Sequence, residues 1–112
     1  ALPISHLRRL RRQLAERKQL AWQALLRFLP AEVKIHHSDS GYFLWLELPA
    51  GVDAGELSDL ALRDNISIAP GKMFSTTANW TSFFRFNTAW GWGEKEEQGV
   101  KRLGELIRQL LP

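Results

Sequence analysis

The chain has 112 residues, of which 45% are hydrophobic and 24% are charged, and its formal net charge at pH 7 is +3. This length and this balance exclude a disordered chain and predict one folded domain. The absence of cysteine excludes a disulfide framework, a thiolate zinc site and a cysteine nucleophile. No run approaches the roughly 20 apolar residues of a membrane span, so we expect a cytoplasmic protein without a membrane partner.

The basic charge is concentrated near the N-terminus. Residues 1–30 carry seven Arg or Lys and one Glu, a balance of +6, whereas residues 31–112 have a balance of −3. Ser5 is a candidate N-cap for a helix that ends at Pro30 and has apolar residues at three- and four-residue steps. At about 24 residues and roughly 36 Å, this helix is longer than a compact domain of this size needs. We therefore expect part of it to pack against a surface outside the chain.

The basic side chains of this helix are a candidate phosphate-binding patch. They are Arg8, Arg9, Arg11, Arg12, Arg17, Lys18 and Arg27. Nucleic-acid-binding surfaces usually add stacking or base-reading groups beside such charges, whereas Trp22 and Phe28 fall on the apolar side of the helix. We interpret the charges as a solvated helix face rather than as a nucleic-acid interface.

Two short strands are predicted next, over 33–37 and 42–48, with a turn at 39–41 between them and Pro49 at the end. This pattern predicts a hairpin. Alternate residues of the second strand share a face, and both sets are largely apolar. One set is Tyr42, Leu44, Leu46 and Leu48, and the other is Phe43, Trp45 and Glu47. We therefore expect both faces of this strand to be covered.

A short helix and two more strands follow. Asp53 is a candidate N-cap for the helix, with a glutamate three residues later, and Asn65 can end the helix in a left-handed conformation. One strand over 66–69 runs into a Pro70–Gly71 turn, and the other, over 83–87, returns after a polar loop.

A last helix begins near Glu94, where acidic residues complement the helix dipole, and has Arg108 in its last turns. Its apolar stripe consists of Val100, Leu103, Ile107, Leu110 and Leu111. The order of the predicted elements is α-β-β-α-β-β-α. This order predicts an α+β fold with two layers, in which helices pack mainly on one face of a mostly antiparallel sheet.

Most candidate metal-binding, phosphate-binding and catalytic motifs in the sequence lack the residue spacing that their chemistry requires. His36 and His37 are adjacent in a strand, point to opposite faces and do not share a metal ion, so we expect no metal site. Lys72 follows Gly71, but the spacing of a phosphate-binding loop is absent. The paired carboxylates near the start of the last helix match capping and solvation. No nucleophile with an adjacent base is present.

Arg85 is the exception, because it lies among phenylalanines in the middle of the strand over 83–87. A charged group at such a position needs a partner, and a carboxylate that accepts two parallel hydrogen bonds is the best one for a guanidinium. In one interpretation that carboxylate belongs to a ligand. In the other, the partner is Glu47 or Asp39, or the guanidinium reaches water from an edge strand. The residues alone leave these alternatives open.

Four segments resemble, in their order and spacing, the C-terminal small domain of fold-type I pyridoxal-phosphate aminotransferases. They are the basic N-terminal helix, GYFLWLELP at 41–49, SIAPGKMFS at 67–75 and FFRFN at 83–87. The sequences of these segments are most similar to those of MocR-type regulators of the GntR family, in which a winged helix-turn-helix DNA-binding domain precedes an aminotransferase-like domain. The resemblance implies that residues 1–112 form one domain, the C-terminal small domain of a larger protein.

The resemblance also implies roles for a few residues. In such domains the arginine of the late strand binds the substrate α-carboxylate, and Arg85 stands at that position, with Asn87 just after it. Gly71 permits a close backbone approach, and Phe74 packs along the same edge. The lysine that binds the cofactor, the aspartate that pairs with its pyridine nitrogen and the phosphate-binding residues belong to the large domain. None of the five lysines here stands in a matching motif, so we expect no catalytic or cofactor-binding residue in this chain.

For the full-length parent, the resemblance implies a ligand sensor that could also act as an aminotransferase. An upstream large domain holds pyridoxal phosphate, an amino acid or amine is the effector, a winged-helix domain binds DNA, and two copies form a homodimer. We expect the chain alone to hold no cofactor and to catalyse nothing. Two alternatives stay open: the same domain in a metabolic class I/II aminotransferase, and a stand-alone module whose basic helix binds an acidic partner.

Overall fold

The computed structural model describes residues 3–36, 41–71, 81–88 and 91–111. Its elements are, in chain order, α1 (Ile4–Phe28), β1 (Lys34–His36), β2 (Phe43–Glu47), α2 (Ala54–Arg63), β3 (Ala69–Pro70), β4 (Phe83–Asn87) and α3 (Glu94–Leu110). The predicted order of helices and strands is confirmed. In this part of the chain, no helix has both the length and the apolar character that crossing a membrane requires.

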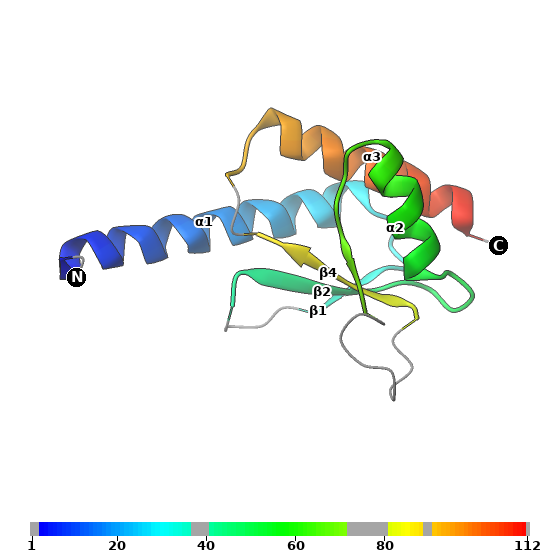
Figure 1. Ribbon diagram of the computed structural model, residues 1–112, viewed down its shortest axis with the longest axis horizontal. Coiled ribbons are helices and arrows are strands. Elements are labelled where there is room, and N and C mark those ends of the chain that lie inside the picture. Colours follow the sequence, from blue (N-terminus) through cyan, green and yellow to red (C-terminus); the bar gives the residue numbers. More distant parts are fainter. Residues whose placement is uncertain (1–2, 37–40, 72–80, 89–90, 112) are drawn as a thin grey trace.

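The four strands form one antiparallel sheet in the order β1-β2-β4-β3. Figure 1 shows the three helices together on one side of this sheet. The side chains that face the helices form the core, and Leu44, Leu46 and Phe84 are 0% exposed. Alternate residues of the same strands point to the opposite, outer face, where they are half-buried or exposed. The predicted α+β fold with two layers is therefore confirmed.

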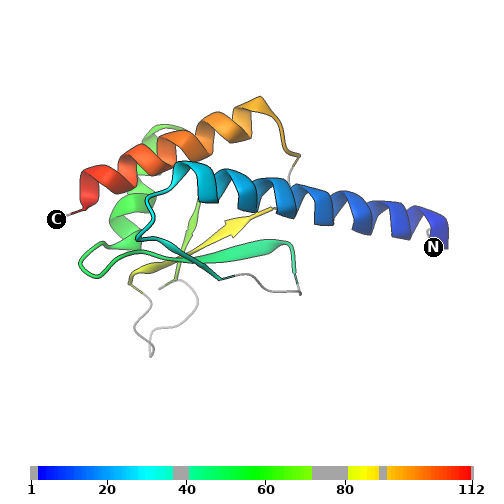
Figure 2. The ribbon, with the colours of Figure 1, turned by 180° about the vertical axis from the view of Figure 1, so that it is seen from behind.

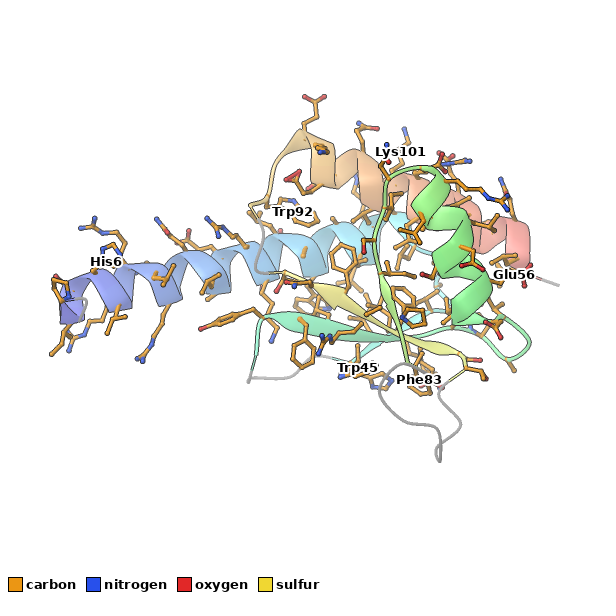
Figure 3. The ribbon with its side chains drawn as sticks, viewed as in Figure 1. His6, Trp45, Glu56, Phe83, Trp92 and Lys101 are labelled. Carbon is orange, nitrogen blue, oxygen red and sulfur yellow. The ribbon has the colours of Figure 1, made fainter. Side chains whose placement is uncertain are left out.

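The outer face of the sheet is rich in aromatic side chains. Phe43 and Trp45 of β2 and Phe83 and Arg85 of β4 lie on it and are half-buried. Figure 3 shows Trp45 and Phe83 on the side of the sheet that faces away from the helices. Among the described elements, no helix covers this outer face. The expectation that both faces of β2 are covered therefore stays a prediction, which requires a covering surface outside these elements.

Helix α1 has an exposed half and a packed half. Every residue from 4 to 13 is exposed, and Figures 1 and 2 show this half extending past the sheet. The packed half buries Lys18, Ala21, Ala24 and Leu25. The exposed half nevertheless carries apolar side chains, and Ile4 is 69% exposed. The expectation that this helix is longer than the domain it packs on is confirmed.

The predicted cap at Ser5 is wrong, because α1 begins at Ile4, two residues before the helix start that a cap at Ser5 implies. The N-cap is Pro3, whose carbonyl accepts hydrogen bonds from the N–H groups of His6 at 3.0 Å and Leu7 at 3.1 Å. The proline ring restricts φ, which is −58° here, so the chain enters the helix without a side-chain cap. Ser5 lies inside the first turn.

The predicted ends of α2 are confirmed. Oδ1 of Asp53 accepts hydrogen bonds from the N–H of Gly55 at 2.6 Å and from the next N–H at 3.1 Å. At the other end Asn65 has a left-handed φ of 61°, and the N–H of Ile66 donates to the carbonyl of Ala61 at 2.9 Å. Asn65 thus turns the chain out of the helix layer and toward the sheet.

Strand β3 is shorter than the predicted strand over 66–69 and includes Pro70, and most of the turn predicted from Pro70–Gly71 lies outside the described residues. The two residues of β3 pair with Arg85 and Phe84 of β4. A proline is tolerated here because β3 is an edge strand. The residues before Ala69 do not pair with β4, because the left-handed turn after α2 starts in the helix layer and the chain must first descend to the sheet.

Helix α3 packs against α1 and α2. Its buried residues are Val100, Leu103, Gly104, Leu106 and Ile107. The predicted stripe is confirmed, with Leu106 as an addition. Nε of Arg102 donates to Oδ2 of Asp64, just after α2, at 2.9 Å, and this hydrogen bond raises the pKa of Arg102.

Some of the sequence predictions lie outside the described residues. They concern His37, Asp39, Ser40, Lys72, Phe74 and the polar loop up to residue 80. Within the described ranges, no group of three His, Asp or Glu side chains is placed to hold a metal ion.

Candidate functional site

Arg85 lies at the centre of the sheet. Its strand, β4, runs between β2 and β3, and Arg85 is directly opposite Trp45 on one side and Ala69 on the other. Trp45 is in turn opposite His36 of the edge strand β1. These four residues therefore form one row across the outer face, in which the guanidinium is the only group that is charged at every physiological pH.

The guanidinium of Arg85 rests on an aromatic ring. Its Cζ lies 5.0 Å from the ring centroid of Phe43, a cation–π contact. The ring of Phe43 is itself held edge-on by Trp45, at 6.4 Å between centroids and 90° between planes. The N–H donors of a guanidinium lie in its own plane, where they match the two oxygens of a carboxylate.

The structure brings both predicted site residues to one cavity of about 490 Å³. The cavity lies between β4 and the residues that precede β3, which do not pair with β4. Its polar and aromatic lining includes Arg85 and Asn87 of β4, Asn65 and Ser67 before β3, and Trp92 and Glu96 around the start of α3. The truncated pairing of β3 therefore creates the space next to Arg85.

Trp92 forms a fixed wall of this cavity. Its Nε1 donates to Oε1 of Glu97 at 2.9 Å, and its ring meets the edge of Phe86 at 6.5 Å between centroids. Figure 3 shows Trp92 between the start of α3 and the body of the domain. The sequence assigned the acidic residues here to capping and solvation only, so the role of Glu97 as a partner of Trp92 was missed. The spacing of five residues between the indole and the carboxylate was the available signal.

Glu47, one of the internal partners considered for Arg85, has another contact. Its Oε1 accepts a hydrogen bond from Nε2 of His36 at 3.0 Å, and the ring of His36 stacks on Phe83 at 6.2 Å and 28°. The register places Glu47 opposite Phe83 rather than Arg85. These side chains and Trp45 line a second space of about 390 Å³ on the outer face. The other internal candidate, Asp39, lies outside the described residues.

The lysines of the described chain do not meet at this cavity. Lys18 is buried in α1 and donates to the carbonyl of Gly41, whereas Lys34, Lys95 and Lys101 are exposed on β1 and α3. Among the described lining residues of the 490 Å³ cavity, the cation is the guanidinium of Arg85, and none of the side chains is a lysine. This donor set fits a carboxylate and does not fit an aldehyde cofactor, which needs an amine.

A solved structure shares this architecture over nearly the whole chain. It is the crystal structure of LysN, the α-aminoadipate aminotransferase of Thermus thermophilus, complexed with N-(5′-phosphopyridoxyl)-L-leucine. The two align with a TM-score of 0.86 and 34% identity, over 95% of this chain and 27% of that one. The chain is an aminotransferase-like small domain.

Sequence relatives of the domain include both regulators and enzymes. It is 78% identical over 107 residues to the Escherichia coli (strain K12) protein named "Uncharacterized HTH-type transcriptional regulator YdcR", and the match covers 96% of this chain and 23% of that protein. It is 35% identical over 105 residues to the 2-aminoadipate transaminase of Thermus thermophilus, over 94% of this chain and 26% of the enzyme. The aminotransferase-like small domain thus spans about a quarter of the length of these relatives. No protein-family model matches the chain.

Proposed function

We propose that this small domain is the C-terminal part of a GntR/MocR-type transcriptional regulator, in which Arg85 binds the carboxylate of an amino-acid effector. The observation that carries the proposal is the arrangement of Arg85, which lies over the ring of Phe43 and shares a cavity with the amide of Asn87. The high identity to a protein named as a helix-turn-helix regulator supports the regulatory branch. The amino-acid adduct in LysN supports the class of ligand.

The proposal divides the site between two parts of a longer protein. Pyridoxal phosphate, held by an upstream large domain, supplies the aldehyde chemistry, since the described lysines of this chain do not line the cavity. This chain's share is recognition: Arg85 donates to the carboxylate, Asn87 adds an amide, and Trp92 limits the space beside them. A ligand that bridges the two parts favours the closed arrangement of the protein, and that shift in population alters the DNA-binding half.

The exposed features of the domain support a covering partner of this kind. The aromatic outer face and the apolar residues of the projecting half of α1 are the surfaces that the remainder of the protein and a second copy would bury. A stand-alone module that binds an acidic partner through its arginines does not explain why Ile4, Leu7 and Leu10 are exposed on the same helix.

A metabolic aminotransferase is the second candidate, and the likeness to the 2-aminoadipate transaminase favours it. Both candidates need the same carboxylate contact at Arg85. They differ in the winged-helix domain, so specific binding of the full-length protein to a DNA fragment from its own promoter separates them. In a gel-shift assay, a protein–DNA complex that persists in the presence of competitor DNA supports the regulator. Loss of the complex under the same conditions supports the enzyme.

The test of the carboxylate contact uses Arg85→Ala in the full-length protein and two ligands. One is N-(5′-phosphopyridoxyl)-L-leucine, and the other is the same adduct made with 3-methylbutylamine, which lacks the carboxylate. We expect calorimetry to show a loss of about 1.5–3 kcal/mol for the first ligand, the range of charge-assisted hydrogen bonds, and almost none for the second.

Arg102→Ala is the matched control, because Arg102 is an arginine whose guanidinium already binds Asp64 and Glu105. It should leave the affinity for both ligands unchanged. Equal losses for the two adducts, or no loss for the carboxylate adduct, would show that Arg85 does not bind the carboxylate.

A further inference from the structure

Lys18 differs from the other basic residues around it in α1. Most residues before it in the helix project into solvent, whereas Lys18 is only 7% exposed. Its Nζ donates to the carbonyl of Gly41 at 3.3 Å, across 23 residues of sequence. An ammonium is costly to bury without such acceptors, and a lysine in a surface helix normally extends its charged end into water. The buried position of Lys18 therefore points to a role inside the domain.

The acceptor of this hydrogen bond lies just before the chain enters β2. Gly41 has a φ of 79°, which favours glycine, and a β-carbon built on it would stand 2.6 Å from Cε1 of Phe43. The ring of Phe43 thus packs directly against the backbone of Gly41. The neighbouring carbonyl of Tyr42 accepts from the N–H of Thr88 at 2.7 Å, so the same segment is also attached to the end of β4.

The ring of Phe43 also carries the guanidinium of Arg85, at 5.0 Å. A continuous series of contacts therefore runs from the helix layer to the outer face of the sheet: Lys18, Gly41, Phe43 and Arg85. Each contact limits the position of the next group. Loss of the first contact leaves the segment at Gly41 attached to β4 only, which gives the ring of Phe43 more freedom to leave the place where it supports the guanidinium.

We propose that Lys18 is a positioning residue for Arg85, which it holds in its ligand-binding place through Gly41 and the ring of Phe43. The inference rests on the proposed function, in which Arg85 binds the effector carboxylate. Lys18 lies next to the boundary between the exposed and the packed half of α1.

The test is a double-mutant cycle in the full-length protein, with N-(5′-phosphopyridoxyl)-L-leucine as the calorimetric probe. Lys18→Met removes the hydrogen bond and keeps the apolar stem, and we expect the affinity to fall roughly fivefold, which is less than the loss from Arg85→Ala. Lys18→Arg keeps a donor and should restore most of the affinity. In the Arg85→Ala background Lys18→Met should cause no further loss, because its effect passes through Arg85.

The control is Lys101→Met, an exposed lysine on α3 that Figure 3 shows on the helix side of the domain, and it should leave the affinity unchanged. Full affinity of Lys18→Met, or a roughly fivefold loss that persists without Arg85, overturns the proposal. If Arg85→Ala itself binds normally, the proposed function fails first, and the two failures are thereby distinguished.

Should Lys18→Met not fold, Phe43→Leu tests the same series of contacts from its other end. It removes the ring beneath the guanidinium, and we expect a loss of similar size that also vanishes in the Arg85→Ala background. An additive loss there refutes the series of contacts.

Discussion

The two glycines of α3 are expected to respond in opposite ways to the same substitution. Alanine is about 1 kcal/mol more favourable than glycine inside a helix. A β-carbon at Gly99 meets nothing within 4 Å, so Gly99→Ala should gain about that amount of stability. Gly104 is buried where α3 crosses the end of α1, and a β-carbon there collides with the carbonyl oxygen of Phe28.

The collision at Gly104 involves backbone, which cannot turn aside as a side chain would. Forced overpacking costs about 1–3 kcal/mol, and at the upper end, minus the gain in helix propensity, the net loss from Gly104→Ala is about 1–2 kcal/mol. The two variants should therefore differ by about 2–3 kcal/mol in their free energy of unfolding. Urea unfolding followed by tryptophan fluorescence and far-UV circular dichroism measures this difference. If Gly104→Ala is as stable as Gly99→Ala, then α3 does not approach the backbone of α1 closely at Phe28.

Two more outcomes are expected. Asp53→Ala removes the side chain that caps α2 and should lower the free energy of unfolding by about 1 kcal/mol, whereas Asp59→Ala, at an exposed position in the same helix, should not; equal urea midpoints would contradict the capping role. In the full-length protein, replacing the four arginines of the exposed half of α1 with glutamine should leave binding to promoter DNA largely intact in a gel shift, and loss of the shift would make this helix a DNA contact. Those arginines are Arg8, Arg9, Arg11 and Arg12.

Much of the fold could be predicted from local patterns. The alternation in β2 predicted that Leu44 and Leu46 share one face and that Phe43 and Trp45 share the other, because a strand sends successive side chains to opposite sides. The predicted extent of β4 and the start of α3 also match the structure. The start of α1 was missed by two residues, since Ser5 has the chemistry of a cap but Pro3 already directs the backbone into the helix.

The candidate site could be predicted only in part. Arg85 was recognisable because a guanidinium among phenylalanines needs a partner, and the resemblance to aminotransferases added Asn87. The residues that complete the cavity, such as Asn65, Trp92 and Glu96, come from segments that carry no shared motif. They lie before β3 or around the start of α3, outside the strand that holds Arg85, so no local pattern connects them to it.

The sequence by itself determined which faces are apolar, where helices and strands alternate, and which arginine is exceptional, because these features depend on near neighbours in the chain. The tertiary structure alone decided what those faces meet. It shortened β3 and so opened the cavity beside Arg85, brought Phe28 against Gly104, and buried Lys18 against Gly41. Each of these contacts depends on the relative placement of whole elements, which is a property of the packed layers and not of any one segment.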